Sequence, residues 1–175
     1  FAGDQLSFNI STYGEIMPYQ YPIGTEHLQS GNYVSGYTVA YEIDGVDKIS
    51  VASYYFRTSI TQVSYTEIVN DDTQLIVEVV TKTSDGAFEI TRVFTHEKSS
   101  SHIKINTTLL NTSGKTISNV VLKSYADWDV ERGTSDNNWG VDPETGLVYV
   151  YKNTYHSISS KQLPDFQDID GWDDY

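Results

Sequence analysis

Residues 73–95 read TQLIVEVVTKTSDGAFEITRVFT, and this stretch decides the fold. Apolar side chains recur at alternate positions on both sides of a central Asp85-Gly86 pair: Leu75, Val77 and Val79 before it, and Phe88, Ile90 and Phe94 after it. Alternation of this kind is typical of a strand with one buried face. Aspartate followed by glycine favours the positive φ angles of a tight turn. The stretch therefore predicts a β-hairpin.

The same pattern extends outward along the chain. In residues 102–110 one face carries Ile103, Ile105, Thr107 and Leu109. Further strands are expected at residues 5–11, 33–43, 48–56, 60–69, 117–125 and 147–151. Asp44-Gly45 and the turn at residues 111–114 join two more hairpins. Regularly spaced short strands predict a single all-β domain over residues 1–175, an antiparallel β-sandwich of the jelly-roll or immunoglobulin-like type.

The charge balance excludes several kinds of partner and site. The net charge is −13, which disfavours binding to nucleic acid because a phosphate backbone would be repelled. The chain has no cysteine, which excludes disulfides, thiolate zinc sites and cysteine nucleophiles. No run of 18 apolar residues is present, so we expect no membrane span.

The start of the chain and its sequons favour export. Phe1 opens an apolar, small-residue beginning that is typical of a mature N-terminus left by a signal peptide, although a chain shortened for expression would begin the same way. Asn-x-Ser/Thr sequons, the acceptor pattern for N-glycosylation, begin at three positions: Asn9, Asn106 and Asn111. We therefore expect an extracellular or cell-surface protein.

Residues 127–175 form an acidic, tryptophan-rich region that we expect to be dominated by loops. In a strand, Asp127, Asp129 and Glu131 would project to one face, where hard carboxylate oxygens suit Ca²⁺. The predicted calcium ligands are Asp127, Asp129, Glu131, Asp136 and Asp142. The spacing departs from an EF-hand loop at Arg132 and Asn138. The alternative is a solvated acidic edge that Arg132 partly neutralises.

The three tryptophans offer a second kind of site in this region. Aromatic rings beside carboxylates can hold sugars, which makes Trp128, Trp139 and Trp172 candidate ligand-binding residues. The alternative is that these rings close the ends of the sandwich core.

Nothing in the sequence indicates catalysis. There is no Gly-x-Ser-x-Gly motif, and the four histidines show no metal-binding spacing. We expect those histidines at the surface or at its boundary. Asp127 and Asp129 could form a glycosidase-like carboxylate pair, but such pairs are common in acidic β proteins. The sequence therefore predicts no catalytic residue and no enzyme, with Ca²⁺ as its one candidate cofactor.

Three segments in the second half of the chain carry a resemblance. Residues 103–114 (IKINTTLLNTSG), 117–122 (ISNVVL) and 125–129 (YADWD) resemble β-sandwich modules of exported prokaryotic proteins, especially archaeal ones. Such modules occur in surface-layer and filament proteins and as appendages of secreted proteases. The resemblance implies an extracellular location and a sandwich architecture, and it implies no activity.

Two functions follow as hypotheses. The first is a structural protein, a self-assembling subunit of a cell-surface filament or layer, in which an extended segment such as residues 1–11 completes an open sheet edge in a neighbouring copy. The chain's partner would then be itself. The alternative is an accessory module of a secreted hydrolase or adhesin that binds calcium, a glycan or both.

Overall fold

The computed structural model describes residues 1–28, 35–53, 56–126, 138–144, 147–152 and 156–161. These residues form an all-β structure in which every sheet is antiparallel, as the sequence predicts, and they contain no helix. It follows that this part of the chain has no helix long and apolar enough to cross a membrane.

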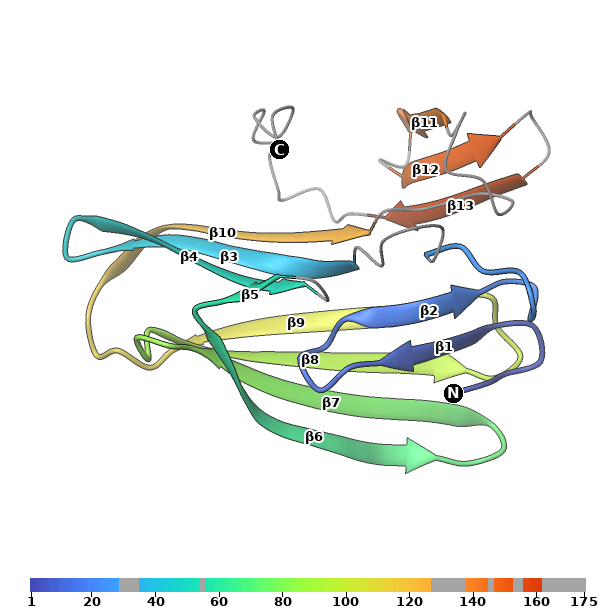
Figure 1. The fold of residues 1–175 in the computed structure, drawn as a ribbon, viewed down its shortest axis with the longest axis horizontal. Helices are drawn as coiled ribbons and strands as arrows, with labels where there is room; N and C mark the ends of the chain where they lie inside the picture. The colour runs from blue at the N-terminus through green and yellow to red at the C-terminus, as the bar shows by residue number, and fades with distance from the viewer. Residues whose placement is uncertain (29–34, 54–55, 127–137, 145–146, 153–155, 162–175) are drawn as a thin grey trace.

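Two four-stranded sheets, a hairpin and a three-stranded sheet make up the structure (Figure 1). The sheet orders are β10-β3-β4-β5, β6-β7-β8-β9, β1-β2 and β11-β12-β13. The strands are β1 (Ser7–Ile10), β2 (Ile16–Gln20), β3 (Ser35–Ile43), β4 (Val46–Ser53), β5 (Arg57–Thr58), β6 (Ile60–Asn70), β7 (Gln74–Thr83), β8 (Phe88–Glu97), β9 (Lys104–Asn111), β10 (Ile117–Ala126), β11 (Asn138–Val141), β12 (Leu147–Lys152) and β13 (His156–Lys161).

The predicted central hairpin is confirmed as β7 and β8. Its alternate apolar side chains are all buried on one face of the sheet: Leu75, Val77, Val79, Phe88, Ile90 and Phe94. Gly86 adopts a positive φ of 72° in the connecting turn, and Gly45 does so between β3 and β4, which pair as the second predicted hairpin. The third predicted hairpin is wrong, because the strands on either side of Gly114, β9 and β10, pair with β8 and β3 in different sheets. Alternation thus indicated correctly which face of β7 and β8 meets the core.

Two elements together cover that buried face (Figure 1). At one end, Phe8 of β1 and Tyr19 of β2 belong to a cluster with side chains of β7 and β8. At the other end, Tyr37 of β3 packs in a second cluster with Ile90 of β8. The core therefore lies between the β6–β9 sheet on one side and the β1–β2 hairpin with the β10-β3-β4-β5 sheet on the other.

The first eleven residues belong to this chain's own core. Leu6, Phe8 and Ile10 are buried there, and the amino group of Phe1 donates a hydrogen bond to the Phe8 carbonyl at 2.8 Å. β1 also pairs with β2 of the same chain. The segment that we expected to complete a neighbour's sheet is thus already engaged within its own domain.

The region that we expected to be dominated by loops contains three strands. β11 pairs with β12, and β12 pairs with β13, in regular antiparallel register. Of these strands the sequence predicts only β12, because β11 is very short and β13 (HSISSK) carries a single large apolar side chain. This sheet begins at Asn138, after the undescribed residues 127–137.

Candidate functional site

Most of the predicted calcium and sugar ligands lie outside the described residues. These are Asp127, Asp129, Glu131, Asp136, Trp128 and Trp172. Trp139 is in β11, opposite Val150 of β12, and the structure describes its backbone only. The Asp142 Oδ1 atom accepts a hydrogen bond from the Glu144 amide at 2.9 Å. The described residues contain no group of three or more His, Asp or Glu side chains that could hold a metal ion.

The three sequon asparagines are all exposed. Asn9 lies on β1 between buried Phe8 and Ile10, and Asn106 lies on β9. The Asn111 side chain stabilises its turn, because its Nδ2 donates to the Lys115 carbonyl at 2.8 Å and its Oδ1 accepts from the Ser113 amide at 3.0 Å. A glycan at Asn9 or Asn106 would displace no buried group.

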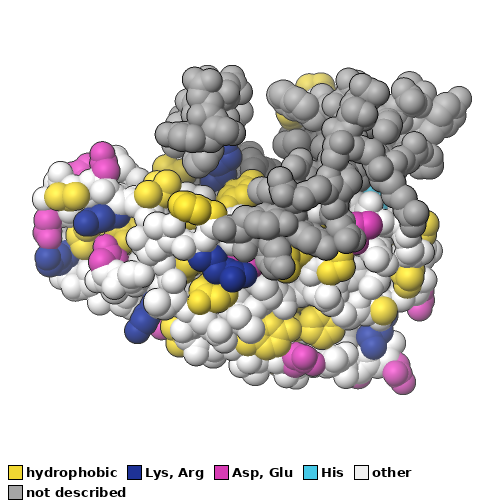
Figure 2. Space-filling model, viewed as in Figure 1, with side chains coloured by type: hydrophobic (Ala, Val, Ile, Leu, Met, Phe, Trp, Pro, Cys, Tyr) yellow, Lys and Arg dark blue, Asp and Glu magenta, His cyan; other side chains and the backbone are white. Residues whose placement is uncertain are grey.

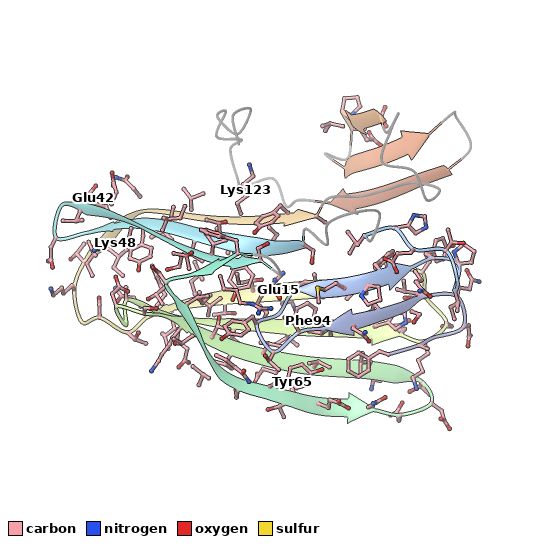
Figure 3. The ribbon with its side chains drawn as sticks, viewed as in Figure 1. Glu15, Glu42, Lys48, Tyr65, Phe94 and Lys123 are labelled. Carbon is pink, nitrogen blue, oxygen red and sulfur yellow. The ribbon has the colours of Figure 1, made fainter. Side chains whose placement is uncertain are left out.

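A charged cluster that the sequence analysis did not identify centres on Glu15, which lies between the layers (Figure 3). Glu15, in the turn between β1 and β2, has no exposed surface. Its Oε1 accepts from the Arg57 Nε at 3.0 Å, and its Oε2 accepts from the Arg57 Nη2 at 2.6 Å. Ser11 also donates to Oε2 at 2.9 Å. A bidentate pair of this kind is strong and directional.

Arg92 is the third member of this cluster. It is 4% exposed, and its Nη1 donates to the Gly14 carbonyl at 2.6 Å. The guanidinium lies over the Tyr37 ring, 4.6 Å from its centroid, while its Nε has no hydrogen-bond partner among the described atoms. Burial lowers the pKa of Arg92 to about 10, against the opposing effects of Tyr37 and Glu15. The side chain therefore remains charged at neutral pH.

Glu15, Arg57 and Arg92 connect three parts of the fold, and we call them the buried charged cluster because Glu15 and Arg92 are buried, while the Arg57 side chain is 35% exposed. Glu15 comes from the β1–β2 turn, Arg57 from β5 in one sheet, and Arg92 from β8 in the other. Both Glu15 oxygens accept hydrogen bonds from Arg57, so both are engaged within the domain. We therefore assign the cluster a structural role, which is to hold the hairpin turn against both sheets.

The histidine expectation was wrong for two residues, because His27 and His96 are buried rather than at the surface. His96 occupies an inward position of β8, where its Nδ1 donates to the His102 carbonyl at 3.0 Å and its ring meets the Phe8 ring edge-on. His27 Nε2 lies 2.5 Å from the Tyr21 carbonyl oxygen. Both rings are hydrogen-bonded to backbone carbonyls, as structural histidines are, and the Nε2 of His96 has no hydrogen-bond partner among the described atoms.

The described residues on the face shown in Figure 2 carry charges of both signs close together rather than one large charged patch. At the turn between β3 and β4, Lys115 forms an ion pair with Asp44 at 2.5 Å, and both side chains are more than half exposed. Asn119 on β10 donates to Glu42 on β3 at 2.9 Å nearby. Ion pairs this exposed contribute little stability.

Three of the four edges of the two large sheets carry features that oppose pairing with another chain. β6 is interrupted by two bulges, and its Glu67 lies opposite buried Val77, on the inner face. β10 is interrupted by a bulge, and Asn119 there has a φ of 52°. On the outer side of β4, the two-residue strand β5 pairs with only part of the strand, and the part left unpaired carries Asp47 and Lys48.

The fourth edge, β9, has no bulge, no positive φ and no inward-facing charge, and its one charged residue is Lys104 at its first position. It pairs with β8 in an uninterrupted register from Lys104 to Asn111, and no strand among the described residues pairs with its other side. It contains no proline, and Ile105 and Leu110 are 37% and 55% exposed. Its unpaired side therefore presents a regular backbone to solvent, with partly exposed apolar side chains beside it. We call this side the free edge of β9.

No family model, no curated protein and no solved structure matches this chain.

Proposed function

We propose that this chain is an extracellular structural protein, a subunit that self-assembles through its sheet edges into a cell-surface filament or layer. The observation that carries this proposal is the free edge of β9, which is long, regular and unprotected at the side of a four-stranded sheet. Proteins that remain monomeric commonly protect such an edge, because its unpaired N–H and C=O groups recruit another strand.

Two further properties support this function. The buried charged cluster holds elements of one domain together, as a structural role requires. The net charge of −13 keeps single copies soluble, and it also makes their association dependent on ionic conditions. Cations bridging the acidic residues between copies, Ca²⁺ among them, would favour assembly. The jelly-roll or immunoglobulin-like type of the fold stays a prediction.

Residues 1–11 do not have the donor role in this proposal. Because Leu6 and Phe8 are fully buried in their own domain, releasing that segment would expose its core. The proposal therefore relies on pairing between preformed edges, which leaves each domain intact.

Electron microscopy of the purified native chain tests the function, together with light scattering over a range of concentrations. We expect ordered fibres or sheets, and we expect a chelator such as EDTA to reduce them if cations bridge the acidic surfaces. A chain that stays monomeric at every concentration and in both ionic conditions would contradict the proposal. The binding-module hypothesis would then be tested with glycan screening.

A further inference from the structure

The direction of the backbone groups along β9 follows from one hydrogen bond. The Thr112 amide donates to the Ala87 carbonyl at 2.9 Å, and this pair continues the register in which Asn111 lies opposite Phe88. In an antiparallel ladder, hydrogen-bonded pairs alternate with pairs that exchange no bonds. The N–H and C=O groups of Ile105, Thr107 and Leu109 therefore point away from β8, to the free edge.

The side chains of these three residues share the inner face of the sheet. Their partners on β8 are Phe94, Arg92 and Ile90, all of which are buried. The free edge thus combines outward-pointing hydrogen-bonding groups with an inward row of Ile105, Thr107 and Leu109. The opposite face of β9 carries Lys104, Asn106, Thr108 and Leu110.

From this arrangement we infer that the free edge of β9 pairs antiparallel with the β9 of a second copy, so that two four-stranded sheets join into one. The inference deepens the proposed function and rests on it. The twofold axis passes through Thr107, which places Ile105 of one copy opposite Leu109 of the other. In this register each residue whose N–H and C=O groups point to the free edge lies opposite such a residue in the other copy. Three such pairs, at two bonds each, form about six hydrogen bonds.

Charge also favours a second copy as the occupant. In this register Lys104 of one copy faces Leu110 of the other, and Leu110 is the ladder partner of Glu89. Lys104 and the other copy's Glu89 are then two strand spacings apart, about 10 Å between backbones, on the same face. Their side chains together can span that distance. The twofold axis produces this contact twice, and the two Lys104 residues stay apart.

The same geometry keeps the Asn106 sequon compatible with pairing. Asn106 projects from the face of the sheet, while the new hydrogen bonds form at its edge. A β9 pair closes on itself, so it supplies a dimeric unit, and growth into a filament or layer needs a second contact elsewhere.

The test compares Thr107→Pro with Thr107→Val in sedimentation-velocity experiments. Proline at this position removes the Thr107 N–H, which points to the free edge, and it breaks no hydrogen bond to β8. Valine keeps that N–H and is the matched control. We expect Thr107→Val to dimerise like the unaltered chain and Thr107→Pro to dimerise at least about 100-fold more weakly, with unchanged far-UV circular dichroism.

A charge reversal decides the question if Thr107→Pro does not fold. Within one chain, Lys104 and Glu89 lie at opposite ends of the β8–β9 ladder. Glu89 also lies opposite Lys82 of β7, so far-UV circular dichroism must show that each variant keeps the fold before its association is compared. We expect Glu89→Lys to weaken the dimer about tenfold at low salt, and Glu89→Lys with Lys104→Glu to restore it. Full assembly by Thr107→Pro, or by Glu89→Lys, would overturn the β9 register while leaving the proposed function standing. An unaltered chain that never associates would overturn both.

Discussion

Substituting Glu15 with glutamine tests whether the buried charged cluster holds the fold together. The change keeps the size and shape of the side chain but removes its charge. It leaves one oxygen to accept from Arg57, so one of the two hydrogen bonds, at 3.0 and 2.6 Å, is lost and the other is weakened, and it removes a carboxylate that acts electrostatically on buried Arg92. The fold would then hold a buried guanidinium without its counter-charge.

The expected loss is a large part of the stability of a single domain. Breaking a buried ion pair from one side costs about 3–5 kcal/mol. The Arg57 side chain is 35% exposed, so water replaces some of its lost bonding, and we expect the lower end, about 3 kcal/mol. A domain of this kind is stable by about 5–15 kcal/mol in total, so the difference is readily measured.

Urea unfolding followed by far-UV circular dichroism measures this loss, with Asp44→Asn as the control. Asp44→Asn breaks the Lys115–Asp44 pair, whose side chains are 56% and 62% exposed, and it should cost at most about 1 kcal/mol. Asparagine also tolerates the φ of 54° at this position. If Glu15→Gln lowers the free energy of unfolding no more than Asp44→Asn does, the structural role of the cluster is refuted.

Two further predictions concern single residues of the core. Burial, with a smaller effect from Tyr21, raises the pKa of Tyr19 to about 12. The folded state therefore keeps a proton that the unfolded state loses near pH 10, so stability falls as the pH rises from about 10 to about 12, and Tyr19→Phe should flatten that fall in urea titrations. A Cβ atom on Gly36 would lie 2.0 Å from the Ala52 carbonyl oxygen. Gly36→Ala should therefore cost at least about 3 kcal/mol in thermal unfolding, and wild-type stability would contradict the β3–β4 register.

The sequence predicts those strands and turns that are determined by residues next to each other in the chain. The β7–β8 hairpin is an example, because alternation selects its buried face and Asp85-Gly86 supplies its turn. β2 was not predicted. Its sequence, IMPYQ, contains a proline and does not alternate clearly, and it forms a strand because β1 and the core beneath it offer a pairing partner and a surface.

The buried charged cluster could not be predicted from sequence because its members meet only in three dimensions. Glu15 and Arg57 are 42 residues apart, and Gly14 and Arg92 are 78 apart. One signal was present in the sequence. Arg92 occupies an inward position between Ile90 and Phe94, where an arginine must be buried with a partner or must disrupt the strand. Such a position predicts a buried charge pair without identifying its other member.

The edges show the same division between local and distant causes. The sequence places β9 correctly as a strand, with one face carrying Ile105, Thr107 and Leu109. Only the sheet order shows that β9 ends its sheet while β8 is internal. Candidate assembly surfaces in β proteins therefore depend on topology, which strand patterns alone do not determine.

Residue-resolved hydrogen exchange tests the central claim of edge pairing most directly. In the dilute chain, the amides of Ile105, Thr107 and Leu109 should exchange quickly, while those of Asn106 and Thr108, which are bonded to β8, should be protected. At concentrations where the chain assembles, the account predicts that all five amides become protected. Rapid exchange at Ile105, Thr107 and Leu109 in the assembled chain would contradict it.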